Sequence, residues 1–186
     1  MNLLAPRPPA RSFPPRPPKA GTSANQAPKP KSKTVSPEQQ IQKLGIKLPA
    51  AQAPIGAYVP ALRSGNLVIT SGQLPLADGK PIAAGKVPTD VSLSEAQQAA
   101  RQAVLNALAA VRAVTGSLDS VVRVVRLNVF VNSAAGFTEQ AKVANGASEL
   151  LLAVFGDAGR GSRCAIGAAE LPLNCPVELD LTVEVR

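Results

Sequence analysis

Catalysis in this 186-residue chain would have to use carboxylates, arginine, lysine, tyrosine, cysteine, backbone groups or bound water. The chain has no histidine, which excludes serine–histidine and cysteine–histidine nucleophile pairs and histidine-based metal sites. The guanidinium of Arg163 offers a planar fork of donors that matches a carboxylate. Glu178 could deliver water or a proton if a cleft of low polarity raised its pKa. Ordinary roles are open for both: an ion pair or a solvent-facing position for Arg163, and a solvated charge beside Asp180 for Glu178.

The two cysteines, Cys164 and Cys175, are too few for a disulfide framework, and we expect both to be reduced. A catalytic cysteine needs a basic or cationic activator. Arg163 precedes Cys164, but adjacent strand residues point to opposite faces of a sheet. Both thiols are therefore interpreted as small buried side chains.

Charge is unevenly distributed along the chain. Residues 1–40 hold ten of the eighteen prolines and seven basic residues but one acid, a net charge of +6, whereas residues 41–186 hold thirteen basic and eleven acidic residues, a net charge of +2. A nearly neutral domain, in a chain with only four phenylalanines, one tyrosine and no tryptophan, argues against specific nucleic-acid binding. No run of eighteen apolar residues is present, so we expect no membrane segment and a cytoplasmic location.

Residues 1–40 are predicted to form a disordered, proline-rich, basic tail. Proline fixes φ and removes a backbone donor, which favours solvated polyproline II. The segment Arg11–Pro17 fits a weak SH3-ligand pattern, and the acid-poor start could be an organelle transit sequence. The interpretation we favour is an extension without a specific role. A short helix could cover Glu38–Leu48.

The rest of the chain predicts one α+β domain. Its clearest helix runs from Ser94 to Val114, because Ser92 and Glu95 form a capping-box pattern, apolar residues recur at helical spacing, and Gly116 provides a stop. A second helix is expected over Thr138–Phe155.

Five strands complete the domain, and they are expected over Ala57–Leu62, Asn66–Gly72, Val121–Val131, Ser162–Ala169 and Val177–Val185. The first two flank a hairpin turn at Arg63–Gly65, and Ala77–Lys80 forms a further turn. The last strand alternates apolar and polar residues, so one face lies in the core and the other faces solvent or a partner. The order β-β-α-β-α-β-β predicts a two-layer domain with a mixed sheet and both helices on one face.

Four segments follow each other in an order and spacing that resemble one protein family. They are Ala53–Tyr58 (A-P-I-G-A-Y), Gly65–Pro75 (G-N-L-V-I-T-S-G-Q-L-P), Val129–Asn145, and Ser162–Asp180, in which R-x₇-L-P precedes V-E-L-D. On these motifs the domain is identified as a member of the RidA/YjgF family of enamine/imine deaminases.

The resemblance implies a chorismate-mutase-like fold that assembles as a homotrimer, with the sheets toward a central barrel and the active sites in clefts between subunits. It implies hydrolysis of reactive enamines and imines of the 2-aminoacrylate type to 2-keto acids and ammonia, without a cofactor or a metal. The ligand would be a small anionic imino or keto acid.

The family pattern also implies roles for single residues. Arg163 takes the carboxylate-binding position, and Glu178 positions water or relays a proton. The cleft would be lined by Tyr58, Ser71, Gly72 and Asn145. For these four residues, strand packing, turn chemistry and ordinary helix surface are the alternatives.

Departures from the pattern predict a divergent subgroup with a reshaped pocket. Ala165 stands where the best-studied branch has cysteine, and Gly167 where it has glutamate; the loop Ala77–Asp90 is longer, and Gly159–Gly161 replaces the usual approach to the arginine. The first alternative to a deaminase is a non-catalytic trimer that binds small carboxylates as a sensor or regulator. An endoribonuclease-type RNA-binding relative is a further alternative, and chorismate mutase activity has only the shared fold behind it.

Overall fold

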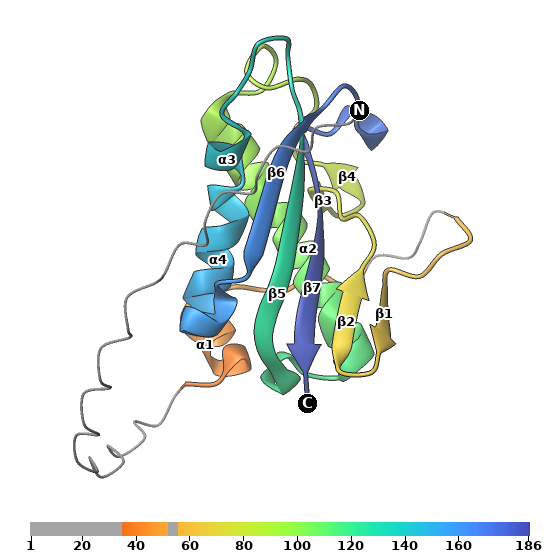
Figure 1. Ribbon diagram of the computed structural model, residues 1–186, viewed down its shortest axis with the longest axis vertical. Helices are drawn as coiled ribbons and strands as arrows, with labels where there is room; N and C mark the ends of the chain where they lie inside the picture. Colours follow the sequence, from red (N-terminus) through yellow and green to blue (C-terminus); the bar gives the residue numbers. More distant parts are fainter. Residues whose placement is uncertain (1–34, 52–55) are drawn as a thin grey trace, which may run out of the picture. The chain divides into compact units, whose positions relative to one another are not determined.

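The structure is a computed structural model that describes residues 35–51 and 56–186 (Figure 1). The expectations for residues 1–34, and for part of the first family segment, lie outside these ranges. The elements in chain order are α1 (Pro37–Lys43), β1 (Ala61–Ser64), β2 (Leu67–Thr70), β3 (Leu76–Ala77), β4 (Lys80–Pro81), α2 (Leu93–Thr115), η1 (Leu118–Ser120), β5 (Val121–Asn132), α3 (Gln140–Val143), α4 (Asn145–Phe155), η2 (Gly156–Gly159), β6 (Ser162–Ala168), η3 (Pro172–Asn174) and β7 (Val177–Val185).

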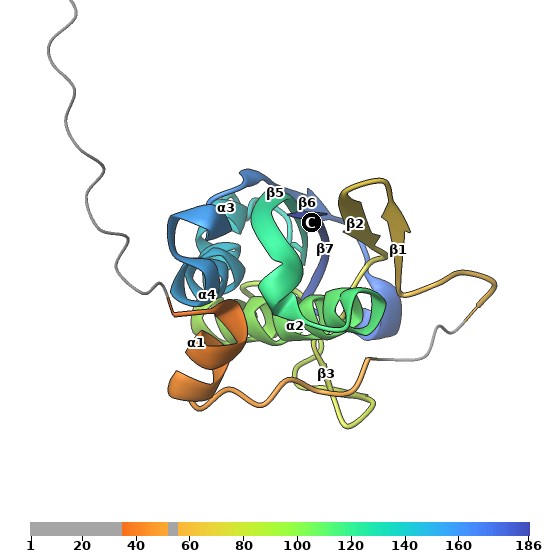
Figure 2. The same cartoon turned by 90° about the horizontal axis from the view of Figure 1, so that it is seen from below.

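One five-stranded sheet, in the order β1-β2-β7-β5-β6, carries the domain, and β3 and β4 form a separate small hairpin. Strands β5 and β6 run parallel, and the other neighbours run antiparallel. Figures 1 and 2 show α1, α2 and α4 together on one side of this sheet. The predicted α+β architecture with a mixed sheet is confirmed, and β1 and β6 form its two edges.

Helix α2 is the centre of the helical layer. The predicted capping box is present, because the Ser92 hydroxyl accepts from the Glu95 N–H while the Glu95 carboxylate accepts from the Ser92 N–H. Gly116 ends the helix in a left-handed conformation. Five alanines of α2 are fully buried, and their small side chains allow the helix to pack closely in the core: Ala96, Ala99, Ala100, Ala103 and Ala107. Within the described ranges, no helix is long and apolar enough to cross a membrane.

Helix α1 corrects the predicted boundary at residue 40. Ser36 caps this helix through a capping box with Gln39, and the N–H of Glu38 donates to Asp119 at 2.9 Å while the Glu38 carboxylate accepts from the Leu118 N–H at 3.0 Å. Ile41 is buried in the core. The helix therefore begins within the segment that was assigned to the tail, and it ends at Lys43, short of the predicted Leu48.

The first hairpin is displaced from its predicted position. Strand β1 starts at Ala61, because Pro60 cannot donate to the ladder. The strands continue to the Ser64–Leu67 pair, so the turn is formed by Gly65 and Asn66. Gly65 has a φ of 61°, the left-handed conformation that glycine favours.

The predicted second helix is divided at Ala144 into α3 and α4. The break precedes Asn145 and Gly146, two residues that are poor helix formers. A Cβ at Gly146 would overlap the backbone carbonyl of Gln97, so this glycine allows α4 to cross α2 closely.

Pairing across the sheet defines its two faces. In β7 the predicted alternation is confirmed, with Val177, Leu179, Leu181, Val183 and Val185 buried against the helices. Strand β5 contains irregularities near Val121 and Val124 and then follows the same phase from Leu127 onward. The face away from the helices is called the open face below.

Candidate functional site

Arg163 lies at the start of edge strand β6 and reaches toward α4. Its Nη1 donates to Asn145 Oδ1 at 2.9 Å and to Ser148 Oγ at 3.0 Å. These three residues form what we call the arginine cluster. Within the described part of the chain both bonds use Nη1, which leaves Nη2 and Nε for a carboxylate.

The geometry of α4 places both acceptors. Asn145 is the first residue of this helix and Ser148 follows three positions later, so they lie on the same face. The Ser148 hydroxyl donates to the Ala144 carbonyl at 3.2 Å, which orients its oxygen lone pairs toward Arg163. Both acceptors of the arginine are thus neutral, so neither of them offsets its positive charge.

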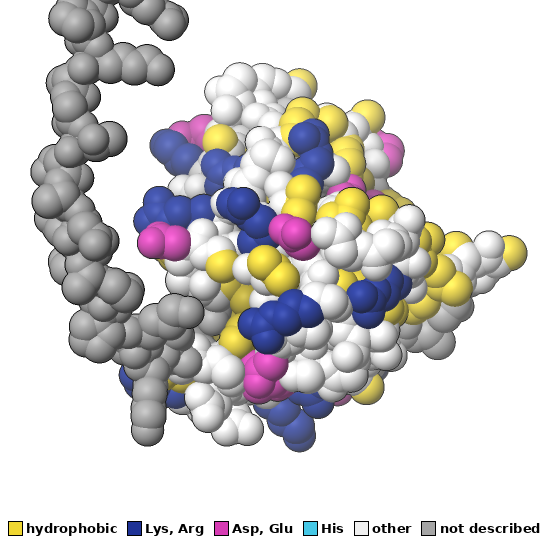
Figure 3. All heavy atoms as spheres, turned by 60° about the horizontal axis from the view of Figure 1, so that its bottom comes forward, with side chains coloured by type: hydrophobic (Ala, Val, Ile, Leu, Met, Phe, Trp, Pro, Cys, Tyr) yellow, Lys and Arg dark blue, Asp and Glu magenta, His cyan; other side chains and the backbone are white. Residues whose placement is uncertain are grey.

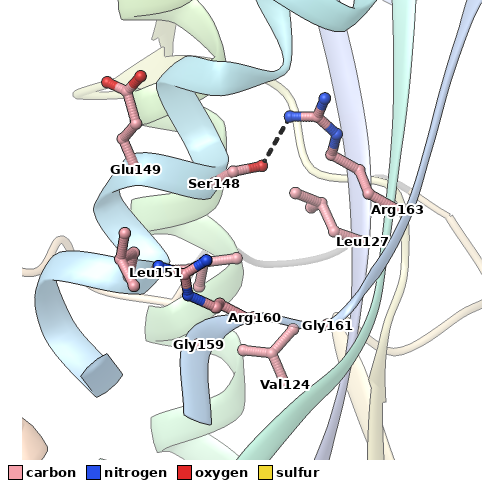
Figure 4. Close-up of a pocket in the computed structure, with 10 residues that line it drawn as sticks. Val124, Leu127, Ser148, Glu149, Leu151, Gly159, Arg160, Gly161 and Arg163 are labelled. Atoms are coloured by element: carbon pink, nitrogen blue, oxygen red, sulfur yellow. Dashed lines mark hydrogen bonds between the residues drawn. The ribbon is translucent and has the colours of Figure 1, made fainter. Parts of the chain in front are cut away.

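An open groove of about 310 Å³ extends from Arg163 (Figure 4). One wall is formed by Val124 and Leu127 of β5 and the other by Leu151 and Leu152 of α4. The segment from Gly159 to Gly161 closes the end away from Arg163. The groove therefore has a cationic end and largely aliphatic walls.

Glu178 lies in a second group, the glutamate cluster, formed with Ser71 and Gly72. Gly72 follows β2, and a Cβ on it would overlap the Glu178 carboxylate. The adjacent Gln73 holds this segment on β7, because its backbone N–H donates to the Leu179 carbonyl at 2.7 Å and its carbonyl accepts from the Leu179 N–H at 3.1 Å. A bare backbone thus lies directly against the carboxylate.

The hydroxyl of Ser71 is already engaged in this arrangement. It donates to the Pro60 carbonyl at 3.2 Å and accepts from Gln73 Nε2 at 3.1 Å. These bonds fix the segment before Gly72, and they indicate that Ser71 shapes the loop. The structural role in a turn, which the sequence left open as an alternative, is therefore one that Ser71 fulfils.

Burial raises the pKa of Glu178 above that of an ordinary glutamate, and the nearby negative charge of Asp180 adds to the effect. Burial raises the pKa of Cys175 to about 11, with a further contribution from Glu178. Cys175 is therefore a protonated thiol near neutral pH and a poor nucleophile. Glu178, in contrast, has the environment of a general acid or base.

Strand register places Arg163 and Glu178 on opposite faces of the sheet. Leu127 of β5 pairs with Arg163 and with buried Leu181, so Arg163 belongs to the helix-covered face. Phe130 pairs with Glu178, so Glu178 belongs to the open face. The expectation that Glu178 lies close enough to Arg163 to direct water is therefore wrong for residues of one chain.

The other candidates are distributed between the two clusters. Tyr58 precedes β1, at the opposite edge of the sheet from Arg163, and its side chain is half exposed. Cys164 pairs with Asn128 and lies on the open face, whereas its neighbour Arg163 lies on the other, as strand alternation predicts. Cys164 is partly exposed and Cys175 is buried.

Sequence patterns missed two residues that orient these groups. Ser148 is the second acceptor for Arg163, and its position three residues after Asn145 is the signal that could have identified it. Gln73 lies within the quoted S-G-Q segment and orients Ser71. In the described ranges no group of three or more histidine, cysteine, aspartate or glutamate side chains could hold a metal ion.

Comparisons with known proteins identify the family and the fold of this chain. Residues 38–185 match the model of a family described as "YjgF/chorismate_mutase-like, putative endoribonuclease". The chain is 49% identical to Protein TCP17 of Trypanosoma cruzi over 78% of its own length and 92% of the relative. It is 31% identical to a 2-iminobutanoate/2-iminopropanoate deaminase of Dermatophagoides farinae, over 76% and 95% of the two chains. The crystal structure of Atu1372 from Agrobacterium tumefaciens, a protein of unknown function, superimposes with a TM-score of 0.73 at 45% identity and covers 81% and 92% of the two chains.

Proposed function

Since the chain belongs to the YjgF/chorismate-mutase-like family, we propose that it hydrolyses reactive enamines and imines of the 2-aminoacrylate type to 2-keto acids and ammonia. The observation that carries this proposal is the arginine cluster, which presents a charged fork oriented by Asn145 and Ser148. An imino acid carries a carboxylate, the anionic group that this fork would bind. A relative at 31% identity is an imine deaminase.

The proposed reaction needs only groups of the protein and water. Arg163 binds the substrate carboxylate, and the iminium carbon accepts the oxygen of a water molecule whose proton passes to the Glu178 carboxylate. Protonated Glu178 then gives this proton to the nitrogen of the carbinolamine, the C–N bond breaks and ammonia leaves. The C=O bond of the keto acid forms as the hydroxyl proton passes to the Glu178 carboxylate, which releases it to the ammonia or to solvent. A carboxyl group with a raised pKa suits these proton transfers.

Because the two clusters lie on opposite faces of one chain, the site we propose is shared between copies of the chain. The arginine cluster lies at the β6 edge, and the hairpin β1-β2 forms the other edge next to the glutamate cluster on β7. In a head-to-tail ring the β6 edge of one protomer meets the β1-β2 edge of the next. We therefore propose a homotrimer in which each cleft combines Arg163 of one protomer with Tyr58, Gly72 and Glu178 of another.

The open face supports this assembly. Leu62, Ile69 and Ile166 are on this face by register, and their side chains are 48%, 38% and 48% exposed. Apolar groups clustered on one side of a sheet favour burial against a partner. Two free thiols, one of them buried, suit the cytoplasm as the place of this activity.

The surface gives RNA cleavage little support. On the face in Figure 3, basic side chains lie in separate groups with acidic and apolar ones among them. RNA recognition uses stacking aromatics and continuous basic surface, and the whole chain has one tyrosine and four phenylalanines.

The experiment generates 2-aminoacrylate with a pyridoxal-phosphate-dependent dehydratase and measures its lifetime with and without the purified protein. We expect the protein to shorten the lifetime and Arg163→Ala to abolish the effect. An unchanged lifetime, together with measurable binding of pyruvate, would identify a non-catalytic carboxylate-binding protein instead.

A further inference from the structure

The groove beside Arg163 is larger than the substrate named above requires. A three-carbon imino acid has almost no side chain, whereas the groove measures about 310 Å³, at the lower end of small-molecule pockets. Its walls contain four aliphatic side chains: Val124, Leu127, Leu151 and Leu152. Val124, Leu127 and Leu151 are 1%, 2% and 1% exposed, so among these four Leu152, at 37%, offers most of the apolar surface from which a ligand could displace water.

The polar groups of the groove are unevenly placed. Arg163 lies at one end, where Asn145 and Ser148 orient it. Arg160 flanks the other end, but its Nε lies 3.3 Å from the Asp157 carboxylate, so its charge has a partner. Figure 4 shows the carboxylate of Glu149 directed away from Arg163. The groove thus joins one anion-binding end to an aliphatic channel.

We propose, on the basis of the function proposed above, that this groove binds the substrate's side chain and selects imino acids with an aliphatic chain of about three to four carbons over the shorter chain of 2-aminoacrylate. The carboxylate binds to Nη2 and Nε of Arg163, and the chain extends between β5 and α4. Leu152, whose side chain is 37% exposed at the rim, contacts the distal carbons. The chemistry at the iminium carbon is the same as that described above.

The test measures direct binding of stable 2-keto acids by calorimetry, so it does not depend on turnover. The ligands are pyruvate, 2-oxobutanoate, 2-oxopentanoate and 2-oxohexanoate, with 2-oxoadipate as a dianion of similar length. We expect affinity to rise about two- to fourfold with each added methylene that the groove covers. Leu152→Ser should weaken binding of 2-oxohexanoate about fivefold and leave pyruvate binding unchanged.

Leu44→Ser is the matched control, because Leu44 is similarly exposed, at 43%, and lies at the end of α1, outside the groove. This variant should bind every ligand like the wild type. Equal affinity across the series in the wild type would overturn the proposal, even if 2-aminoacrylate is hydrolysed. Tighter binding of 2-oxoadipate, lost in Arg160→Gln, would also overturn it, in favour of a dianionic substrate. If the wild type binds the longer 2-keto acids more tightly but does not hydrolyse 2-aminoacrylate, only the deaminase function is rejected.

Discussion

Arg163 and Glu178 point to opposite faces of the same five-stranded sheet, with β5 between their strands. Arg163 contacts helix α4, and Glu178 lies against the backbone of Gly72. Side chains separated in this way cannot act on the same small molecule. Catalysis as proposed above therefore treats the two clusters as half-sites and requires a second copy of the chain.

The contact between Gly72 and Glu178 gives the first prediction. In Gly72→Ala the new methyl group would displace the flexible Glu178 carboxylate, so kcat should fall about 10- to 100-fold. The melting temperature should change little, because the atom that must move is the end of a side chain. Steady-state kinetics and thermal melts check both expectations.

A double-mutant cycle identifies the cause of that loss. If Gly72→Ala acts through Glu178, adding it to Glu178→Gln should cost no further activity. Ser71→Ala serves as control, since it removes a hydroxyl without adding an atom beside the carboxylate. Additive losses in the double variant would show that Gly72 acts independently.

Ser148 should act as a positioning residue for Arg163. Ser148→Ala removes one of the two acceptors of Nη1, so KM for the imino acid should rise about five- to tenfold with kcat nearly unchanged. Ser148→Thr keeps the hydroxyl and should restore KM. A fall in kcat at constant KM would contradict a role in carboxylate binding.

Glu178 should make stability depend on pH. Burial raises its folded pKa above the unfolded value, so the folded chain holds more protons in the window between the two. The free energy of unfolding contributed by this group is therefore present at low pH and lost as pH rises through the folded pKa. Glu178→Gln should gain stability relative to the wild type as pH rises above the unfolded pKa of about 4.3.

Urea denaturation at a series of pH values measures this gain. Glu149→Gln removes an exposed carboxylate of α4 and controls for the loss of one charge. A stability difference between wild type and Glu178→Gln that stays constant with pH would show that Glu178 is not perturbed by folding.

Cys175 should be chemically inert in the folded protein. It is fully buried and burial raises its pKa to about 11, so little thiolate forms near neutral pH. In a Cys164→Ser variant, an aromatic disulfide reagent should react with the remaining thiol only after unfolding. Rapid reaction of the native variant would place Cys175 at an accessible surface.

The elements that sequence patterns located best have local signals. Strand β7 was predicted from Val177 to Val185 because its alternation is strict, and α2 was located within one residue at each end by Ser92 and Gly116. The break at Ala144 and the irregularities of β5 were missed, since they depend on how α4 crosses α2 and on how β5 pairs with β7.

The candidate site was predictable in its parts and not in its geometry. The family motifs indicated four residues that the structure brings together in pairs. Arg163 contacts Asn145, and Gly72 lies against Glu178. Alternation within a strand indicates which neighbours share a face. It does not show whether a residue of β6 and a residue of β7 share a face, because that depends on how each strand pairs with β5.

Mixing two inactive variants tests the shared site most directly. Arg163→Ala and Glu178→Gln are refolded together in equal amounts, so that random assembly places an intact Arg163 and an intact Glu178 at about one cleft in four. The mixture should recover about a quarter of the wild-type rate of 2-aminoacrylate hydrolysis, while each variant refolded alone stays inactive. If wild type refolded in the same way regains full activity and the mixture none, the two residues do not serve one active site across the subunit boundary.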